Sequence, residues 1–67
     1  MKVKVNGELR ELPDGTATVR ALLDEVRYSF PLLIVRVNGS LVERGAYSRA
    51  PVSDGDEVEV YHLVSGG

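Results

Sequence analysis

The chain has 67 residues, a formal net charge of −2, 43% hydrophobic residues and no cysteine. This length fits one domain, and the hydrophobic content is that of a globular protein rather than a disordered chain. The lack of cysteine excludes a disulfide scaffold, a zinc–thiolate site and a catalytic thiol. The basic residues are scattered, which disfavours nucleic-acid binding. Because no apolar run reaches bilayer length and no signal peptide opens the chain, we expect a cytoplasmic protein without a membrane partner.

The N-terminal segment predicts a β-hairpin. Residues Lys2–Asn6 alternate between polar and apolar side chains, which is the period of a strand. Asn6-Gly7 follows, and both residue types tolerate the positive φ of a type I′ turn. Glu8–Leu12 is then the returning strand, with Leu9 as its inward residue, and it ends at a Pro-Asp-Gly turn.

A short helix is expected next. Thr18 is a candidate N-cap, because its hydroxyl can accept a hydrogen bond from an amide of the first turn. Four apolar residues follow at helical spacing and form one stripe: Val19, Leu22, Leu23 and Val26. The helix should end by about Tyr28, because Pro31 disfavours helical geometry in the residue before it.

The second half of the chain predicts a further hairpin and a final strand. Leu33–Val37 reads as a strand, and Asn38-Gly39 repeats the turn signal of the first hairpin. We expect a short edge strand at Leu41–Glu43 and a turn or one helical turn within Gly45–Ala50. The last strand should run from Glu57 to Val64, after a tight turn.

This order of elements predicts an α+β roll, with one helix packed on one face of a mixed sheet of four to five strands. If the last strand pairs beside the first, as in a β-grasp, it lies in the middle of the sheet. We expect one domain over residues 1–64 and a flexible tail over residues 65–67. The expected core is Val3, Val5, Leu9, Val19, Leu22, Leu23, Val26, Val35, Val37, Val58 and Val60.

The polar residues indicate no enzyme site in the chain itself. An acidic run of Asp54, Asp56, Glu57 and Glu59 could bind a hard cation, but no further ligands accompany it, and a solvated turn is the better interpretation. His62 is the sole histidine, so we expect a packing or surface residue and no metal site. No serine lies in a nucleophile-elbow pattern. These patterns point to a carrier or a binding module.

Three apolar residues form a candidate docking patch. By strand alternation, Ile34, Tyr61 and Leu63 lie on the sheet face away from the helix. An outward apolar cluster on neighbouring strands is typical of a protein interface, although single exposed apolar residues are common. We predict that this trio, with Arg36 and Glu59 at its rim, contacts a partner protein.

Five stretches in order resemble one protein family: "VNGELRELPDG", "TVRALLDEV", "VNGSLVERGAY", "DGDEVEV" and the final "GG". Together they are similar to the ubiquitin-like sulfur carriers, and most similar to the thiamine-biosynthesis branch (ThiS). The small subunit of molybdopterin synthase (MoaD) is the alternative branch, since it also ends in Gly-Gly. A carrier for tRNA thiolation, a ubiquitin-like protein modifier and a plain binding module remain further alternatives.

The resemblance implies a covalent cosubstrate rather than an enzyme. An E1-like partner would use ATP to adenylate the Gly67 carboxylate, and a sulfur donor such as a sulfurtransferase would then convert it to a thiocarboxylate. The acceptor partner would be thiazole synthase, or the large subunit of molybdopterin synthase. Gly66 and Gly67 lack a Cβ atom, so with Ser65 they could thread through a narrow channel. No cofactor is expected to be bound by the chain.

Overall fold

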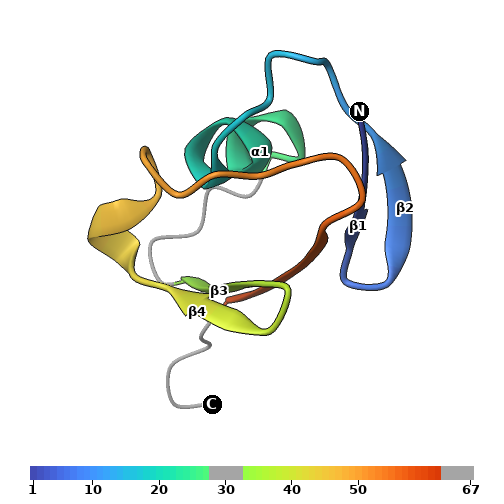
Figure 1. The fold of residues 1–67 in the computed structure, drawn as a ribbon. Helices are drawn as coiled ribbons and strands as arrows, with labels where there is room; N and C mark the ends of the chain where they lie inside the picture. Colours follow the sequence, from blue (N-terminus) through green and yellow to red (C-terminus); the bar gives the residue numbers. More distant parts are fainter. Residues whose placement is uncertain (28–32, 63–67) are drawn as a thin grey trace.

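The structure is a computed structural model that describes residues 1–27 and 33–62. Its described part is a five-stranded sheet with one α-helix packed on one face (Figure 1). The elements are β1 (Lys2–Val5), β2 (Glu8–Glu11), α1 (Val19–Glu25), β3 (Leu33–Val37), β4 (Ser40–Val42), the 3₁₀ turn η1 (Arg44–Ala46) and β5 (Glu57–His62). Within the described ranges, no helix is long and apolar enough to cross a membrane.

The strand order β2-β1-β5-β3-β4 places the last strand in the middle of the sheet. β5 is parallel to β1, where Val58 lies opposite Val5. It is antiparallel to β3, where Val60 lies opposite Val35. The two hairpins therefore lie on either side of β5, and the predicted α+β roll with a β-grasp arrangement is confirmed.

Both Asn-Gly pairs form the turns that the sequence predicts. Asn6 and Asn38 have φ values of 53° and 51°, and the glycines that follow have φ values of 81° and 84°. Positive φ at both central residues is the signature of a type I′ turn. Each turn therefore joins its two strands with a two-residue loop, which fixes the register of the hairpin.

The same two asparagines also hold the central strand. The Oδ1 atom of Asn6 accepts the N–H of Val60 at 2.7 Å, and its Nδ2 donates to the Val60 carbonyl at 2.9 Å. Asn38 acts at the start of β5, where its Oδ1 accepts the main-chain N–H of Glu57 at 2.9 Å and its Nδ2 donates to the Oδ1 atom of the Asp56 side chain at 3.0 Å. Asparagine suits both positions, because its amide supplies a donor and an acceptor and the residue tolerates positive φ.

The helix begins as predicted and ends earlier than the predicted limit. The Thr18 hydroxyl accepts the N–H of Ala21 at 3.2 Å, which confirms the N-cap. α1 ends at Glu25, and Arg27 then adopts a φ of 63°, which terminates helical geometry. The predicted limit at Tyr28 lies outside the described residues, as does the predicted end of the last strand at Val64.

The core lies between α1 and the sheet. Its buried residues are Val3, Val5, Leu12, Val19, Leu22, Leu23, Val35, Tyr47, Val52, Val58 and Val60. Val26 and Val37, which were predicted to be core residues, are partly buried against it. Tyr47 and Val52 were not predicted, because they lie in irregular segments without strand or helix periodicity. Leu12 was not predicted, because placing Leu9 inward assigns Leu12 to the opposite face of the same strand.

The prediction that Leu9 points inward is wrong, since its side chain is 62% exposed. The two-residue turn places Val5 opposite Glu8, so Leu9 lies opposite Lys4. Residues opposite each other in an antiparallel pair lie on the same face of the sheet. Leu9 therefore shares the outward face of Lys4, and the buried leucine of this segment is Leu12.

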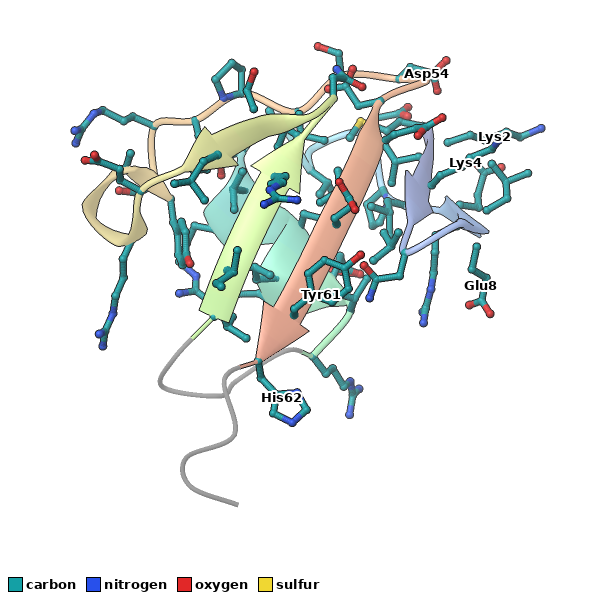
Figure 2. All side chains as sticks on the ribbon, turned by 90° about the horizontal axis from the view of Figure 1, so that it is seen from below. Lys2, Lys4, Glu8, Asp54, Tyr61 and His62 are labelled. Carbon is teal, nitrogen blue, oxygen red and sulfur yellow. The ribbon has the colours of Figure 1, made fainter. Side chains whose placement is uncertain are left out.

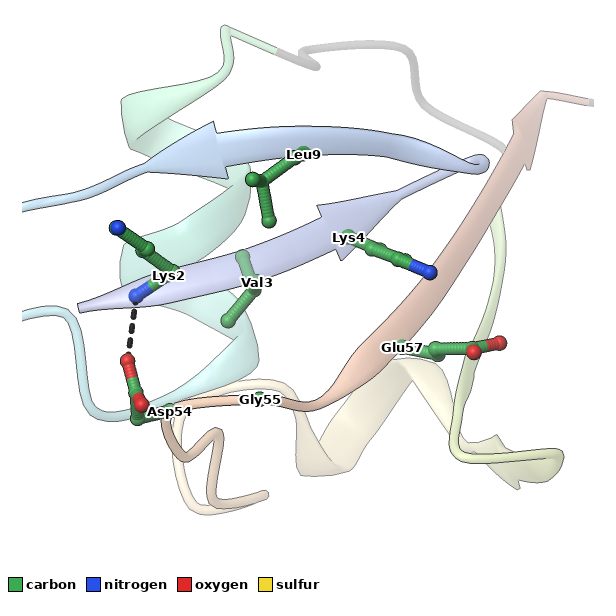
Figure 3. A pocket seen from close by; sticks show the side chains of 7 residues that line it. All are labelled: Lys2, Val3, Lys4, Leu9, Asp54, Gly55 and Glu57. Atoms are coloured by element: carbon green, nitrogen blue, oxygen red, sulfur yellow. Dashed lines mark hydrogen bonds between the residues drawn. The ribbon is translucent and has the colours of Figure 1, made fainter.

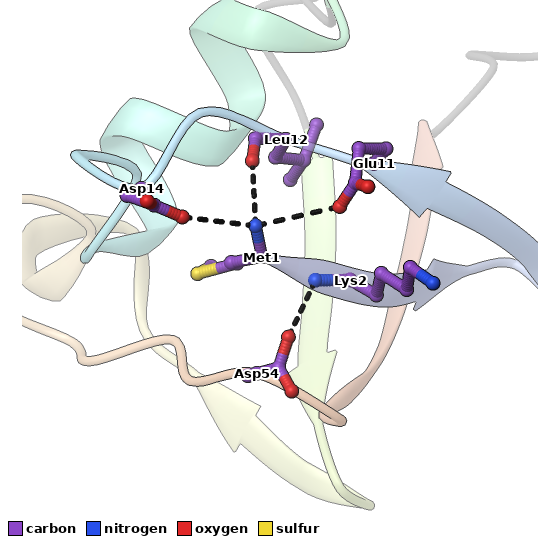
Figure 4. Close-up of polar contacts among 6 residues, drawn as sticks. All are labelled: Met1, Lys2, Glu11, Leu12, Asp14 and Asp54. Atoms are coloured by element: carbon purple, nitrogen blue, oxygen red, sulfur yellow. Dashed lines mark hydrogen bonds and ion pairs between the residues drawn. The ribbon is translucent and has the colours of Figure 1, made fainter.

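Polar contacts fasten the start of β1 to two neighbouring segments (Figure 4). The Met1 ammonium donates to the Leu12 carbonyl at 2.9 Å and to Asp14 at 3.1 Å, and it pairs with Glu11 at 3.4 Å. The hydrogen bond to Asp14, with the two carboxylate charges, raises the pKa of the Met1 amine. The N–H of Lys2 donates to Asp54 at 2.6 Å, which ties β1 to the turn before β5.

Replacing Leu23 with alanine should lower the free energy of unfolding by about 2–5 kcal/mol, because the side chain is fully buried and the change leaves a cavity. Urea denaturation followed by circular dichroism measures this loss. Leu9→Ala is the matched control and should change stability by less than about 0.5 kcal/mol, because Leu9 is exposed. Equal losses in the two variants would contradict the assignment of the core.

Candidate docking face

The sheet face opposite α1 is open to solvent. Figure 2 views the sheet from this side, and no described helix or loop crosses β3 and β5. Strand registers place the following side chains on it: Lys2, Lys4, Leu9, Glu11, Ile34, Arg36, Leu41, Glu57, Glu59 and Tyr61. We name these residues the outward face.

The structure brings four of the five predicted docking residues together. Ile34 lies opposite Tyr61, and Arg36 lies opposite Glu59, across the β3–β5 pair. Tyr61 is 49% exposed, whereas Ile34 is partly buried. Leu63, the fifth predicted residue, lies outside the described residues, and the docking role of all five stays a prediction.

Tyr61 is held in place by its neighbours on the outward face. Its hydroxyl donates to Oε2 of Glu59 at 2.9 Å (Figure 2 shows Tyr61). This hydrogen bond and the negative charge of Glu59 raise the pKa of Tyr61, while the positive charge of Arg36 lowers it by less. Tyr61 is thus an exposed residue with an apolar ring and a hydrogen-bonded hydroxyl, and residues of this kind often anchor protein interfaces.

Two exposed leucines lie on this face in addition to the predicted docking residues. Leu41 is 64% exposed and lies opposite Arg36, so it extends the apolar surface of Ile34 and Tyr61 onto β4. Leu9 is 62% exposed and lies on β2 at the other edge of the sheet. Their orientation follows from the two Asn-Gly turns, since a two-residue loop determines which residues lie opposite each other.

A shallow groove lies at the β1–β2 side of the outward face (Figure 3). Its lining residues are Lys2, Val3, Lys4, Leu9, Asp54, Gly55 and Glu57. In Figure 3, Asp54 turns toward the main chain of β1, where it accepts the N–H of Lys2. The groove therefore combines one exposed leucine with lysines and carboxylates of balanced charge.

The acidic run organises the turn before β5. Asp54 accepts the N–H of Lys2, and Asp56 accepts the N–H of Ser53 at 2.8 Å. Gly55 has a φ of 87°, which this turn requires. Among residues 1–27 and 33–62, no group of three His, Cys, Asp or Glu side chains could hold a metal ion. His62 ends β5, where it is exposed and lies opposite Leu33.

The three residues assigned to the tail, Ser65, Gly66 and Gly67, lie outside the described residues. β5, the strand that precedes them, is described through His62. The docking residues Glu59 and Tyr61 lie on this same strand. Part of the docking prediction and the tail prediction therefore concern one continuous segment of the chain.

Replacing Glu59 with glutamine should lower the pKa of Tyr61 toward its ordinary value of 10.0, because the charged acceptor of its hydrogen bond is lost while Arg36 remains. A pH titration of the Tyr61 ring signals by NMR measures this shift. Glu57→Gln is the matched control, because Glu57 lies on the same strand and face without contacting the Tyr61 hydroxyl. A Tyr61 pKa that stays unchanged in Glu59→Gln would contradict the hydrogen bond.

Comparison with known sequences gives a match over nearly the whole chain. A family model described as "ThiS family" matches residues 3–67. Two curated relatives are thiazole synthases, one from Paramagnetospirillum magneticum at 34% identity and one from Magnetococcus marinus at 33% identity, each over 67 residues. The match covers 100% of this chain and 20% of each relative, so the chain spans about a fifth of their length.

Comparison with solved structures supports the same relationship. The crystal structure of the thiamine biosynthesis protein ThiS from Geobacter metallireducens superposes with a TM-score of 0.85 at 30% identity, covering 100% of both chains. The solution NMR structure of a thiamine biosynthesis protein from the same organism gives a TM-score of 0.78 at 30% identity, covering 100% of this chain and 88% of the other. The likeness therefore includes both hairpins and the helix as well as the central strand.

Proposed function

The chain belongs to the ThiS family, and we propose that it is a sulfur carrier of thiamine biosynthesis. In this proposal the carboxylate of Gly67 is adenylated by an E1-like enzyme and converted to a thiocarboxylate. The thiocarboxylate then donates its sulfur to thiazole synthesis. The chain itself acts as a cosubstrate of partner enzymes and not as a catalyst.

The observation that carries the proposal is the extent of the family match, which runs from residue 3 through the two final glycines. The solved ThiS structure adds that the match has the same fold over both chains. The residue chemistry is compatible with a carrier, because the sulfur would be held by a main-chain carboxylate and no cysteine is required.

The chemistry explains why partner enzymes are needed. A carboxylate is a poor electrophile, so the activating enzyme would use ATP to join it to AMP and release pyrophosphate. Sulfide would then attack the carbonyl carbon and displace AMP, which forms the thiocarboxylate directly. A donor persulfide would instead displace AMP to form an acyl disulfide, and a thiol would have to reduce this disulfide to release the thiocarboxylate. Gly66 and Gly67 suit this step because residues without a Cβ atom pass through a narrow channel and adopt angles that other residues avoid.

The outward face would supply the affinity for the activating enzyme. Ordering a glycine tail costs conformational entropy, so binding energy must come from elsewhere on the molecule. Tyr61, Ile34 and Leu41 provide apolar surface next to the Arg36–Glu59 pair. Leu63 would extend this surface toward the tail.

The comparisons favour the thiamine branch over the molybdopterin branch. Two relatives named thiazole synthase contain a region that matches this chain in full. The matched solved structures are also described as thiamine biosynthesis proteins. A thiazole synthase is therefore the acceptor enzyme that we propose.

The proposal is tested by incubating the protein with its E1-like partner, ATP and sulfide and measuring the intact mass. The mass should increase by the difference between one sulfur and one oxygen atom, and mild hydrolysis should reverse the increase. A variant with one alanine added after Gly67 is the matched control, because it keeps the fold but moves the carboxylate. Sulfur uptake by this extended variant, or no uptake by the natural chain, would contradict the proposal.

The same assay measures the contribution of the outward face. Tyr61→Ala should raise the carrier concentration that gives half-maximal activation by roughly tenfold, the effect of losing about 1.4 kcal/mol of binding energy. The maximal rate should stay unchanged, because Tyr61 takes no part in the reaction of the carboxylate in this mechanism. Leu9→Ala is the control, since Leu9 is also exposed but lies on the edge strand β2, two strands away from β5. Equal effects of the two variants would show that Tyr61 is not a docking residue.

A further inference from the structure

β2 is an edge strand of the described sheet, and its outer side is open to pairing with another strand. It stands at one end of the described sheet, and all four of its residues, Glu8–Glu11, are exposed. Figure 1 shows no described element beside it on the side away from β1. Such an edge offers unpaired main-chain N–H and C=O groups to another strand.

The ladder between β1 and β2 shows which of these groups face outward. Met1 and Leu12 exchange both main-chain hydrogen bonds, at 2.7 Å and 2.9 Å. In an antiparallel pair, hydrogen-bonded and non-hydrogen-bonded residue pairs alternate. Since Lys4 lies opposite Leu9 in a non-hydrogen-bonded position, the N–H and C=O of Leu9 point away from β1. The N–H and C=O of Glu11 also point away from β1, because Glu11 lies opposite Lys2 in a non-hydrogen-bonded position.

The side chains of β2 alternate in a way that makes the strand self-complementary. Glu8 and Arg10 lie on one face and form an ion pair, with 3.3 Å between Oε1 and Nε. Leu9 lies on the other face, next to Lys4. The aliphatic stem of Lys4 can cover the exposed leucine.

Two copies of β2 can pair antiparallel about a two-fold axis at any of its four residues, and the charges distinguish these registers. An axis at Glu8, at Arg10 or at Glu11 places that residue opposite its own copy, with like charges in contact. An axis at Leu9 places Glu8 opposite Arg10 of the second copy, and Arg10 opposite Glu8. Opposite charges across a strand pair are stabilising and like charges are destabilising.

The Leu9 register also pairs the outward main-chain groups of Leu9. The outward N–H of Leu9 would donate to the Leu9 carbonyl of the second copy, and the reverse bond would form by symmetry. The two leucines would meet on the outward face, with Lys4 beside each of them. The two Glu8 and two Arg10 side chains would occupy alternating corners of a rectangle on the opposite face.

We propose that β2 is a self-association edge, through which a second copy of this chain pairs antiparallel with Leu9 on the two-fold axis. The contact is small, so the dimer is weak, with a dissociation constant on the order of tens of micromolar to one millimolar. Tyr61 and Ile34 lie on β5 and β3, beyond β1, and stay accessible in this dimer. The proposal therefore stands independently of the proposed function.

Sedimentation equilibrium of the intact chain up to about one millimolar tests the proposal. The natural protein should show a monomer–dimer equilibrium. Glu8→Arg and Arg10→Glu should each weaken the dimer by roughly tenfold or more, because each brings like charges together. An equimolar mixture of these two variants should recover the dimer, since every opposed pair is again of opposite charge. A chain that stays monomeric at one millimolar would overturn the proposal.

Two further variants separate this edge from other contacts. Leu9→Pro removes the outward-facing N–H together with the leucine side chain on the two-fold axis, so it should abolish the dimer. Because this N–H makes no hydrogen bond to β1, the circular-dichroism spectrum should stay unchanged. Leu41→Lys places a charge at an equally exposed leucine on the opposite edge strand and should leave the dimer intact. A dimer that is lost in Leu41→Lys, or that survives both charge reversals, would show that the copies meet elsewhere.

Discussion

The side chains of Asn6 and Asn38 form hydrogen bonds with the main chain of β5. The position of this central strand, and with it the arrangement of the whole sheet, depends on these hydrogen bonds. Within the part of the chain that the structure describes, β5 pairs with β1 at Lys4–Glu57 and Val5–Val58. The Asn6 side chain continues the contact by binding both main-chain groups of Val60, beyond the last of these pairs. Each hairpin turn thus holds the central strand by a side chain as well as by strand pairing.

A strand fixed in this way can perform several tasks at once. Val58 and Val60 point to α1 and are almost completely buried, while Glu59 and Tyr61 point to solvent. In the proposed function, the core side fixes the position of the strand, the outward side binds the activating enzyme and the residues after His62 carry the reacting carboxylate. The terminal carboxylate would then belong to the same segment of the chain as Glu59 and Tyr61 of the proposed docking surface.

Local turn chemistry made most of the fold predictable from the sequence. The Asn-Gly pairs, the Thr18 cap and the apolar stripe each act over a few residues, and the structure contains all of them. The orientation of Leu9 was also predictable in principle, because the first turn sets the register, but alternation within the strand alone gave the wrong face. Tyr47, whose hydroxyl donates to the Leu33 carbonyl at 3.4 Å, lies in a segment without periodicity and gave no signal. The Asn6–Val60 contact spans 54 residues, so only the folded chain reveals it.

The most direct measurement is amide hydrogen exchange by NMR in Asn6→Gly and Asn38→Gly. Glycine keeps the positive φ of each turn, so these variants remove only the side chain that holds β5. Exchange of the Val60 amide should accelerate at least about tenfold in Asn6→Gly, because a buried donor loses its acceptor, while the Glu57 amide stays protected. In Asn38→Gly, exchange of the Glu57 amide should accelerate while the Val60 amide stays protected. Unchanged protection of Val60 in Asn6→Gly would contradict the account, because strand pairing alone would then hold the central strand.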